Sequence, residues 1–280
     1  MTVQFDAAVG RVRLDPATFD TLVDLATDAH PDAHPDARTQ APADARATDD
    51  LTATGVLVDG HPTEVLAPAL AAVARPLARL ETVVASRHQL LVHQGWLSLL
   101  SAVLADVGDG SYDFAGVATE FVPTTIARLV RLRPRTRLGA GSVTVTPDLL
   151  DGLLDPDDGR RARAADALGT ALASDFAEAA GLVRDGAWCF WSAVVSWAPP
   201  GRSVRSDADL VSRRVSVLDT TAGMLALEAS GPPGADRLSL VPTTPTDVWF
   251  LLSSILPSDA DLGADAADDS AHESTDHRGS

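Results

Sequence analysis

The sequence predicts an α+β fold of two pseudo-symmetric lobes, each made of helices and an antiparallel β-meander that is closed by a helix. The first observation is a repeated unit, because Phe121-Val-Pro-Thr-Thr and Leu240-Val-Pro-Thr-Thr-Pro each follow strand-like segments and precede an apolar helix. The second is a pair of helix starts at Asp15-Pro16 and Thr146-Pro147, where a capping side chain precedes a proline at the first helical position. Such runs of helices and strands are typical of α+β units.

A further helix is expected at the front of the second half. Asp155-Pro156-Asp157-Asp158 caps a long helix toward Ala180, with Gly181 as its C-terminal stop. Gly55-Val-Leu-Val-Asp-Gly60 in the first half also echoes Gly181-Leu-Val-Arg-Asp-Gly186 in the second. We interpret this echo as support for two matching halves.

Apolar segments separated by turn residues predict the strands of each half. They lie at 80–87, 96–106 and 112–119 in the first half and at 187–197, 214–219, 224–229 and 238–241 in the second. The segment 187–197 is apolar on both faces, which predicts a central strand covered by helices on each side. The alternative is that part of this strand awaits a partner.

These elements define the expected domain organisation. Residues 1–138 form the first half and 139–257 the second, packed together as one globular unit. Within the first half, residues 28–50 are rich in Pro, Ala, Asp and Thr, so we expect a flexible insertion. Residues 258–280 are expected to be a disordered acidic tail, because they carry seven acidic residues and one arginine.

Composition excludes several classes of function. The net charge is −17, and about −7 remains on the body when 28–50 and the tail are set aside, which argues against nucleic-acid binding. Cys189 is the one cysteine, so no internal disulfide is possible. The start has no signal-peptide pattern, and no apolar run is long enough to span a bilayer. We expect a soluble cytoplasmic protein without membrane insertion.

No motif predicts a catalytic, cofactor-binding or metal-binding site. The repeat His30-Pro-Asp-Ala-His34-Pro-Asp-Ala contains possible metal ligands but lies in the expected flexible insertion, where no rigid geometry holds them. The body offers His88, His93 and Cys189 as candidate bases and nucleophile, yet nothing local activates the thiol. A hydrolase that uses His88 or His93 in a cryptic pocket remains an alternative.

Five arginines crowd the segment that follows the first repeated unit. They either form a patch for an acidic partner or compensate the helix C-terminus and run into a polar linker, which is the interpretation we favour. The residues are Arg128, Arg131, Arg133, Arg135 and Arg137.

The order of elements from Val12 to Pro257 resembles the EspG family of ESX, or type VII, secretion-associated proteins. The resemblance is carried by Gly55–Gly60 before a helix, by the hairpin Val215-Ser-Val-Leu-Asp-Thr-Thr-Ala-Gly223 and by the terminal stretch 241–257. It implies a non-catalytic cytoplasmic chaperone of pseudo-two-fold α/β architecture that binds the apolar tip of a helical PE–PPE heterodimer and directs it to secretion.

A chaperone for a helical tip needs an apolar groove with aromatic or aliphatic anchors. We place candidate partner contacts in the loop 199–212 and in the closing helix, at Val204, Leu210, Trp249, Phe250 and Leu252. A general protein-interaction or regulatory domain fits the same pattern and stays open as a further alternative.

Overall fold

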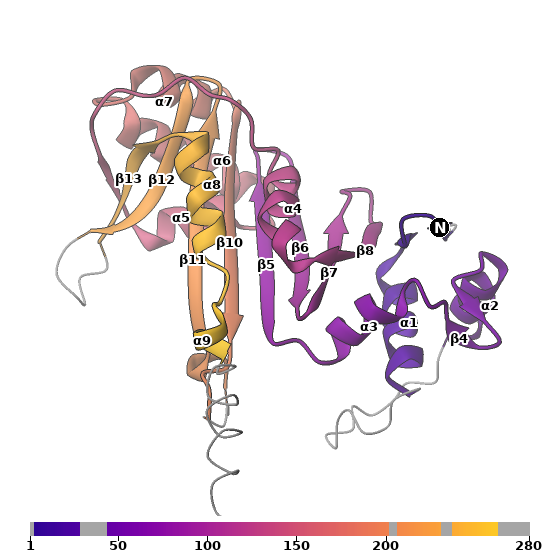
Figure 1. The fold of residues 1–280 in the computed structure, drawn as a ribbon. Coiled ribbons are helices and arrows are strands. Elements are labelled where there is room, and N and C mark those ends of the chain that lie inside the picture. Colours follow the sequence, from indigo (N-terminus) through magenta and orange to yellow (C-terminus); the bar gives the residue numbers. More distant parts are fainter. Residues whose placement is uncertain (1–2, 29–43, 202–205, 231–236, 263–280) are drawn as a thin grey trace, which may run out of the picture.

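The computed structural model describes residues 3–28, 44–201, 206–230 and 237–262, and within these residues eleven strands form one antiparallel sheet. The order across the sheet is β1-β2-β8-β7-β6-β5-β10-β11-β12-β13-β9. Strand β5 (Ala78–Ala85) and strand β10 (Trp188–Trp197) pair in the middle (Figure 1). From this pair outward, β5-β6-β7-β8-β2 of the first half corresponds to β10-β11-β12-β13-β9 of the second.

The other strands of the sheet are β1 (Gln4–Asp6), β2 (Arg11–Leu14), β6 (Leu90–Leu97), β7 (Leu100–Asp106), β8 (Tyr112–Ala118), β9 (Val143–Val145), β11 (Val211–Thr220), β12 (Gly223–Ser230) and β13 (Arg237–Thr243). A separate hairpin pairs β3 (Leu57–Val58) with β4 (His61–Pro62). The helices are α1 (Pro16–Asp28), α2 (Ala45–Ala53), α3 (Ala67–Ala74), α4 (Val122–Leu129), α5 (Pro147–Leu153), α6 (Asp158–Leu172), α7 (Ala177–Arg184), α8 (Pro245–Ser254) and α9 (Asp259–Leu262).

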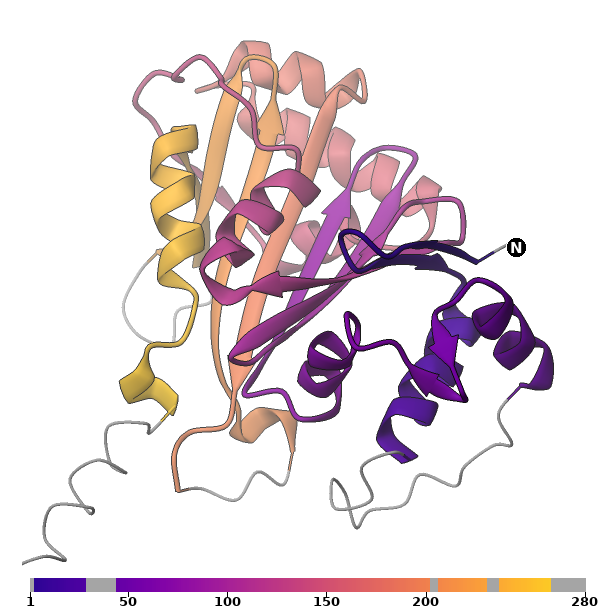
Figure 2. The same cartoon turned by 45° about the vertical axis from the view of Figure 1, so that its right-hand side comes forward.

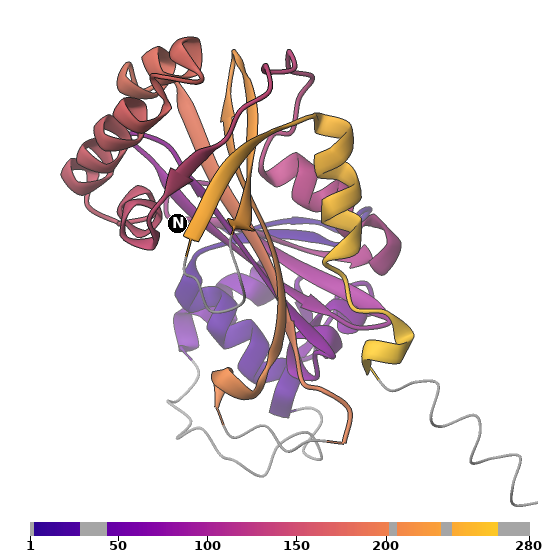
Figure 3. The same ribbon diagram turned by 90° about the vertical axis from the view of Figure 1, so that its left-hand side faces the viewer.

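Helices cover both faces of the sheet (Figure 3). One face, which we call the α4/α8 face, buries Trp191, Ala193 and Val195 of β10 beneath α4 and α8. The opposite face packs against α5–α7 in the second half and against α1–α3 in the first. We call it the groove face. The prediction of a central strand covered by helices on each side is confirmed for the first part of β10, where Trp188 and Phe190 are buried on the groove face and Trp191 and Ala193 on the α4/α8 face. Nearer the end of the strand, Val194 and Ser196 are only partly buried on the groove face.

The two halves repeat the same order of elements, but the repeated Val-Pro-Thr-Thr unit does not occupy equivalent places. In the first half Val122 to Thr125 lie inside α4. In the second half Val241, Pro242 and Thr243 end β13, and Thr244 is the N-cap of α8 in a capping box with Asp247. The motif therefore marks the strand-to-helix junction in both halves at different registers.

The predicted helix starts are confirmed, whereas two predicted elements are each divided in two. Asp157 caps α6, yet this helix ends at Leu172 and α7 follows, so Gly181 lies inside a helix and does not stop one. The expected strand 96–106 is β6 and β7, joined by a turn at Ser98 and Leu99. The Gly55–Gly60 echo is also not structural, because it forms β3 and its turn, whereas its counterpart is the end of α7.

Both segments expected to be flexible contain described helices. Residues 45–50 belong to α2, which Asp44 caps by accepting a hydrogen bond from the Arg46 amide. Residues 259–262 form α9, so the expected disordered tail cannot begin at 258. The other parts of the two segments, 29–43 and 263–280, lie outside the described residues. The His-Pro-Asp repeat belongs to 29–43.

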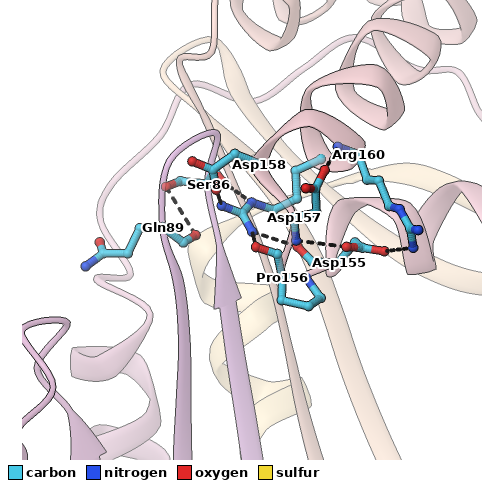
Figure 4. A network of polar contacts seen from close by, with 8 residues as sticks. Ser86, Gln89, Asp155, Pro156, Asp157, Asp158 and Arg160 are labelled. Carbon is cyan, nitrogen blue, oxygen red and sulfur yellow. Dashed lines mark hydrogen bonds and ion pairs between the residues drawn. The ribbon is translucent and has the colours of Figure 1, made fainter.

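The halves are joined on the groove face by the buried guanidinium of Arg161 in α6. Figure 4 shows its surroundings, where Ser86 of the β5–β6 turn lies near Pro156 and Asp158. The Nε of Arg161 donates to the Ser86 carbonyl at 3.1 Å. Its Nη1 donates to the carbonyls of Asp155 and Pro156 at 2.6 and 2.9 Å, and its Nη2 pairs with Asp158. The turn of the first half is thereby fixed to the start of α6 in the second.

A second tie holds the linker between the halves. Arg135 forms a bidentate ion pair with Asp219 of β11, with nitrogen to oxygen distances of 2.7 and 3.1 Å. Asp219 is only 5% exposed. Gly223 starts β12 with φ +153°, and a Cβ there would lie 2.6 Å from Cγ of Leu138 in the linker. The linker consequently lies directly on the β11–β12 turn.

Candidate partner-binding surface

A groove of ≈ 1010 Å³ opens on the groove face between the two helix groups. Its floor consists of two rows of outward side chains that run across β6, β5, β10 and β11. The strand register places Trp96, Arg79, Ser196 and Ser212 in one row and Gln94, Glu81, Val194 and Arg214 in the other. One side is lined by Ala74, the last residue of α3, and by Arg75, Pro76 and Leu77 after it. Leu210 lines the β11 end.

The groove exists because helices leave one end of the central strands uncovered. At the other end of the same face, Ala85, Trp188 and Phe190 are buried against α5–α7. Towards Ala78 and Trp197 no helix of the described residues takes that place, and the floor residues Arg79 and Glu81 are exposed. Figure 2 shows the separation of α3 from α6 and α7 across the sheet.

The groove combines apolar and cationic side chains. Leu77 is 52% exposed, and Trp96 and Leu210 are partly exposed beside it. Arg79 and Arg214 stand on the floor, with Glu81 as the one acidic floor residue, and none of these three forms an ion pair among the described residues. The sequence predicted an apolar groove between the lobes, and the observed groove is instead mixed in character.

A second exposed surface lies on α8. Trp249, Phe250 and Leu251 are 38%, 66% and 39% exposed. We call these three residues the α8 stripe. Because α8 packs on the face opposite the groove, the stripe and the groove cannot both contact one compact helical tip.

The predicted contact residues are therefore divided between different parts of the molecule. Leu210 lines the groove, whereas Trp249 and Phe250 belong to the α8 stripe. Leu252 is fully buried in the core under α8, so its selection as a surface contact was wrong. It follows Trp249 to Leu251 in the chain, but the helix turns its side chain toward the sheet. Val204 lies outside the described residues.

Sequence reasoning missed the charged floor of the groove. Arg79 and Glu81 alternate with the buried Ala78 and Leu80 along β5, which is the ordinary pattern of a strand with one open face. That pattern was available in the sequence. What it did not provide was the pairing of β5 with β10, which brings Arg79 next to Ser196.

The candidate catalytic residues do not form a site. His93 is 3% exposed, and its Nδ1 accepts a hydrogen bond from the Asp106 amide at 3.0 Å. Burial lowers the pKa of His93 to about 4, and burial raises the pKa of the Cys189 thiol to about 12. His88 is exposed in the β5–β6 turn. With these pKa values His93 is a weak base and the Cys189 thiol stays protonated at pH 7.

The remaining features to be located are possible metal ligands, membrane spans and the five crowded arginines. The described residues contain no cluster of His, Cys, Asp and Glu suited to a metal ion. They also contain no helix that combines the length and apolarity of a membrane span. Of the five crowded arginines, Arg128 lies in the last turn of α4 and Arg135 binds Asp219, while Arg131, Arg133 and Arg137 are exposed.

This arrangement, an open antiparallel sheet built from two like halves with a central groove, is an EspG-like fold. Among solved structures the chain is similar to EspG5, the type VII secretion system chaperone of Mycobacterium tuberculosis, in its complex with a PE25-PPE41 dimer. The TM-score is 0.56 at 12% sequence identity, and the match covers 89% of this chain and 96% of that chain. No family model and no curated protein matches the sequence. The predicted α+β class and EspG resemblance are confirmed at the level of fold.

Proposed function

We propose that this protein is a non-catalytic chaperone or adaptor of type VII secretion that acts in the cytoplasm on a helical PE/PPE-like heterodimer. The observation that carries the proposal is the structural similarity to EspG5, a chaperone whose structure was solved in complex with a PE25-PPE41 dimer. The absence of an assembled catalytic group among the described His and Cys residues is compatible with this role.

We further propose that the groove, and not the α8 stripe, receives the tip of the partner. The groove offers partly exposed Leu77, Trp96 and Leu210 as apolar anchors beside unpaired arginines. Anchors of this kind dominate the affinity of helix-in-groove complexes, and the surrounding charges set orientation. A concave site also shields more of a partner's apolar surface than one convex helix does.

The test is co-expression of this chain with PE–PPE pairs from its source organism, followed by purification through a tag on the PE protein. We expect one pair to bring the chain down at a 1:1:1 ratio. Leu77→Asp with Leu210→Asp should weaken that complex by at least about tenfold, because charges would replace two exposed anchors.

The matched control is Phe250→Asp, a similar change on the opposite face that should leave binding intact. Loss of binding in the control with retention in the groove variant would move the site to the α8 stripe. If no pair binds the unchanged chain, the secretion role fails, and the general interaction domain becomes the better interpretation.

A further inference from the structure

The charge of the groove is opposite to that of the protein. Arg75, Arg79 and Arg214 line it with Glu81, so the titratable residues named in its lining carry a net charge of +2. The chain as a whole carries −17. None of these four side chains forms an ion pair among the described residues. A cationic floor of this kind favours an acidic occupant.

The last described helix brings the end of the chain close to this groove. Asp261 of α9 holds Arg213 of β11 through two contacts of 3.0 and 2.9 Å, and Arg213 also stacks over Trp197 at 4.9 Å from the ring centroid. Arg213 points to the α4/α8 face, so its neighbours Ser212 and Arg214 point into the groove. The chain after Leu262 therefore begins just across the sheet from the groove, at the lower ends of β10 and β11 in Figure 1.

We propose that the C-terminal segment 263–280 of this chain occupies the groove. The segment carries five acidic residues against Arg278, so its net charge of −4 complements the groove. Its reach is roughly 60 Å when extended, far more than the roughly 10 Å needed to pass around a sheet. Because it is tethered, its effective concentration at the groove is in the millimolar range, which compensates for weak individual ion pairs.

Occupation of the groove would make the segment a competitor of the partner. A PE–PPE tip would have to displace it, so an unloaded chaperone would keep its apolar anchors covered. This consequence rests on the proposed function. The occupation itself does not, because it needs no other molecule.

The test uses the full chain with Ser270→Cys, a nitroxide label on that cysteine and the backbone amide NMR signals of Arg79, Gln94 and Ser212. Cys189 is not labelled under the same conditions, since burial raises the pKa of its thiol to about 12. In about 0.05 M NaCl we expect at least about twofold loss of these signals relative to amides of β1, and recovery in about 0.5 M NaCl.

Two variants decide whether the groove arginines are responsible. Arg79→Glu with Arg214→Glu should abolish the signal loss, and the neutral pair Arg79→Gln with Arg214→Gln serves the same purpose if charge reversal disturbs folding. Arg133→Glu with Arg137→Glu changes the charge equally on the exposed linker and should retain it. Both arginines of this control are exposed.

The proposal is overturned if the label causes no loss of the groove amide signals at low salt, or if the signal loss persists in both groove variants. It is also overturned if the signal loss is largest at the α8 stripe. Partner binding separates the two proposals. If the chain binds a PE–PPE pair but the label causes no signal loss, only the proposal for the C-terminal segment is rejected. If the label causes signal loss but no pair binds, only the proposed secretion role is rejected.

Discussion

Arg161 provides the most demanding stability prediction. Arg161→Met removes a guanidinium that is 2% exposed while keeping a side chain of similar length. The substitution leaves the carbonyls of Ser86, Asp155 and Pro156 without this donor. Of these contacts, the one to Ser86 crosses between the halves, so the loss affects their junction as well as the start of α6.

The expected cost follows from the number of groups left unpaired. A fully buried acceptor that loses its donor costs about 1–3 kcal/mol. The three carbonyls that Arg161 binds are only partly buried, so water will replace part of the lost hydrogen bonding. The apolar methionine offsets part of the loss, because burying it carries no desolvation penalty. We therefore expect the free energy of unfolding to fall by about 2–4 kcal/mol.

The measurement is urea unfolding followed by tryptophan fluorescence, with the midpoint compared at equal slope. Arg160→Met is the matched control, since Arg160 is the neighbouring residue, its side chain is 66% exposed, and its ion pair with Asp155 is on the surface. That control should cost no more than about 1 kcal/mol. If the two variants lose similar stability, the role of Arg161 as a tie between the halves is refuted.

Three further predictions concern the core and the linker. Burial holds the pKa of His93 at about 4, below the 6.5 of an unfolded histidine. The contribution of His93 to the free energy of unfolding should therefore be complete above pH 6.5 and fall by up to about 3 kcal/mol toward pH 4. His93→Phe should flatten this pH dependence in urea titrations. Asp219→Ala should cost about 2–4 kcal/mol in the same assay by leaving Arg135 unpaired, and a cost below about 1 kcal/mol would show that the linker tie is dispensable. Gly223→Ala should lower the melting temperature by several degrees, whereas Gly139→Ala, which has open space around it, should leave the melting temperature unchanged.

The parts of the fold that the sequence predicted are those with local causes. Thr146 before Pro147 predicts the start of α5, and the Thr146 hydroxyl does accept a hydrogen bond from the Leu149 amide. The apolar character of both faces of β10 likewise reflects its own residues. Caps, prolines and side-chain alternation are all written within a few positions of the element that they specify.

The turn between β6 and β7 shows why other elements were missed. Ser98 and Leu99 are neither glycine nor proline, so the apolar run looked like one strand. The turn is held by Thr119, whose hydroxyl donates to the Ser98 carbonyl at 2.7 Å from the end of β8. A contact of this kind depends on the pairing of β7 with β8, which no local pattern reveals.

The candidate site was predicted less well for the same reason. Leu210 in the loop 199–212 and Trp249 in the closing helix were both selected as apolar contacts for one partner. In the structure Leu210 lines the groove, whereas Trp249 is exposed on α8, which packs on the opposite face. The groove floor draws residues from four strands, and its central pair, β5 and β10, is distant in sequence. Its composition becomes visible only when β5 and β10 are known to pair.

The pairing of β5 with β10 also explains why, among the described residues, the groove opens at one end of these central strands. A pseudo-two-fold relation about this pair would give the two ends of the central strands equivalent surroundings on the groove face. The end near Ala85 is filled, because α6 packs along α7 and Arg161 draws the β5–β6 turn beneath it. In the first half the helices pack over β2, β6, β7 and β8 and bury no residue of β5, so the end near Ala78 stays open. The difference between the halves, more than their likeness, creates the groove.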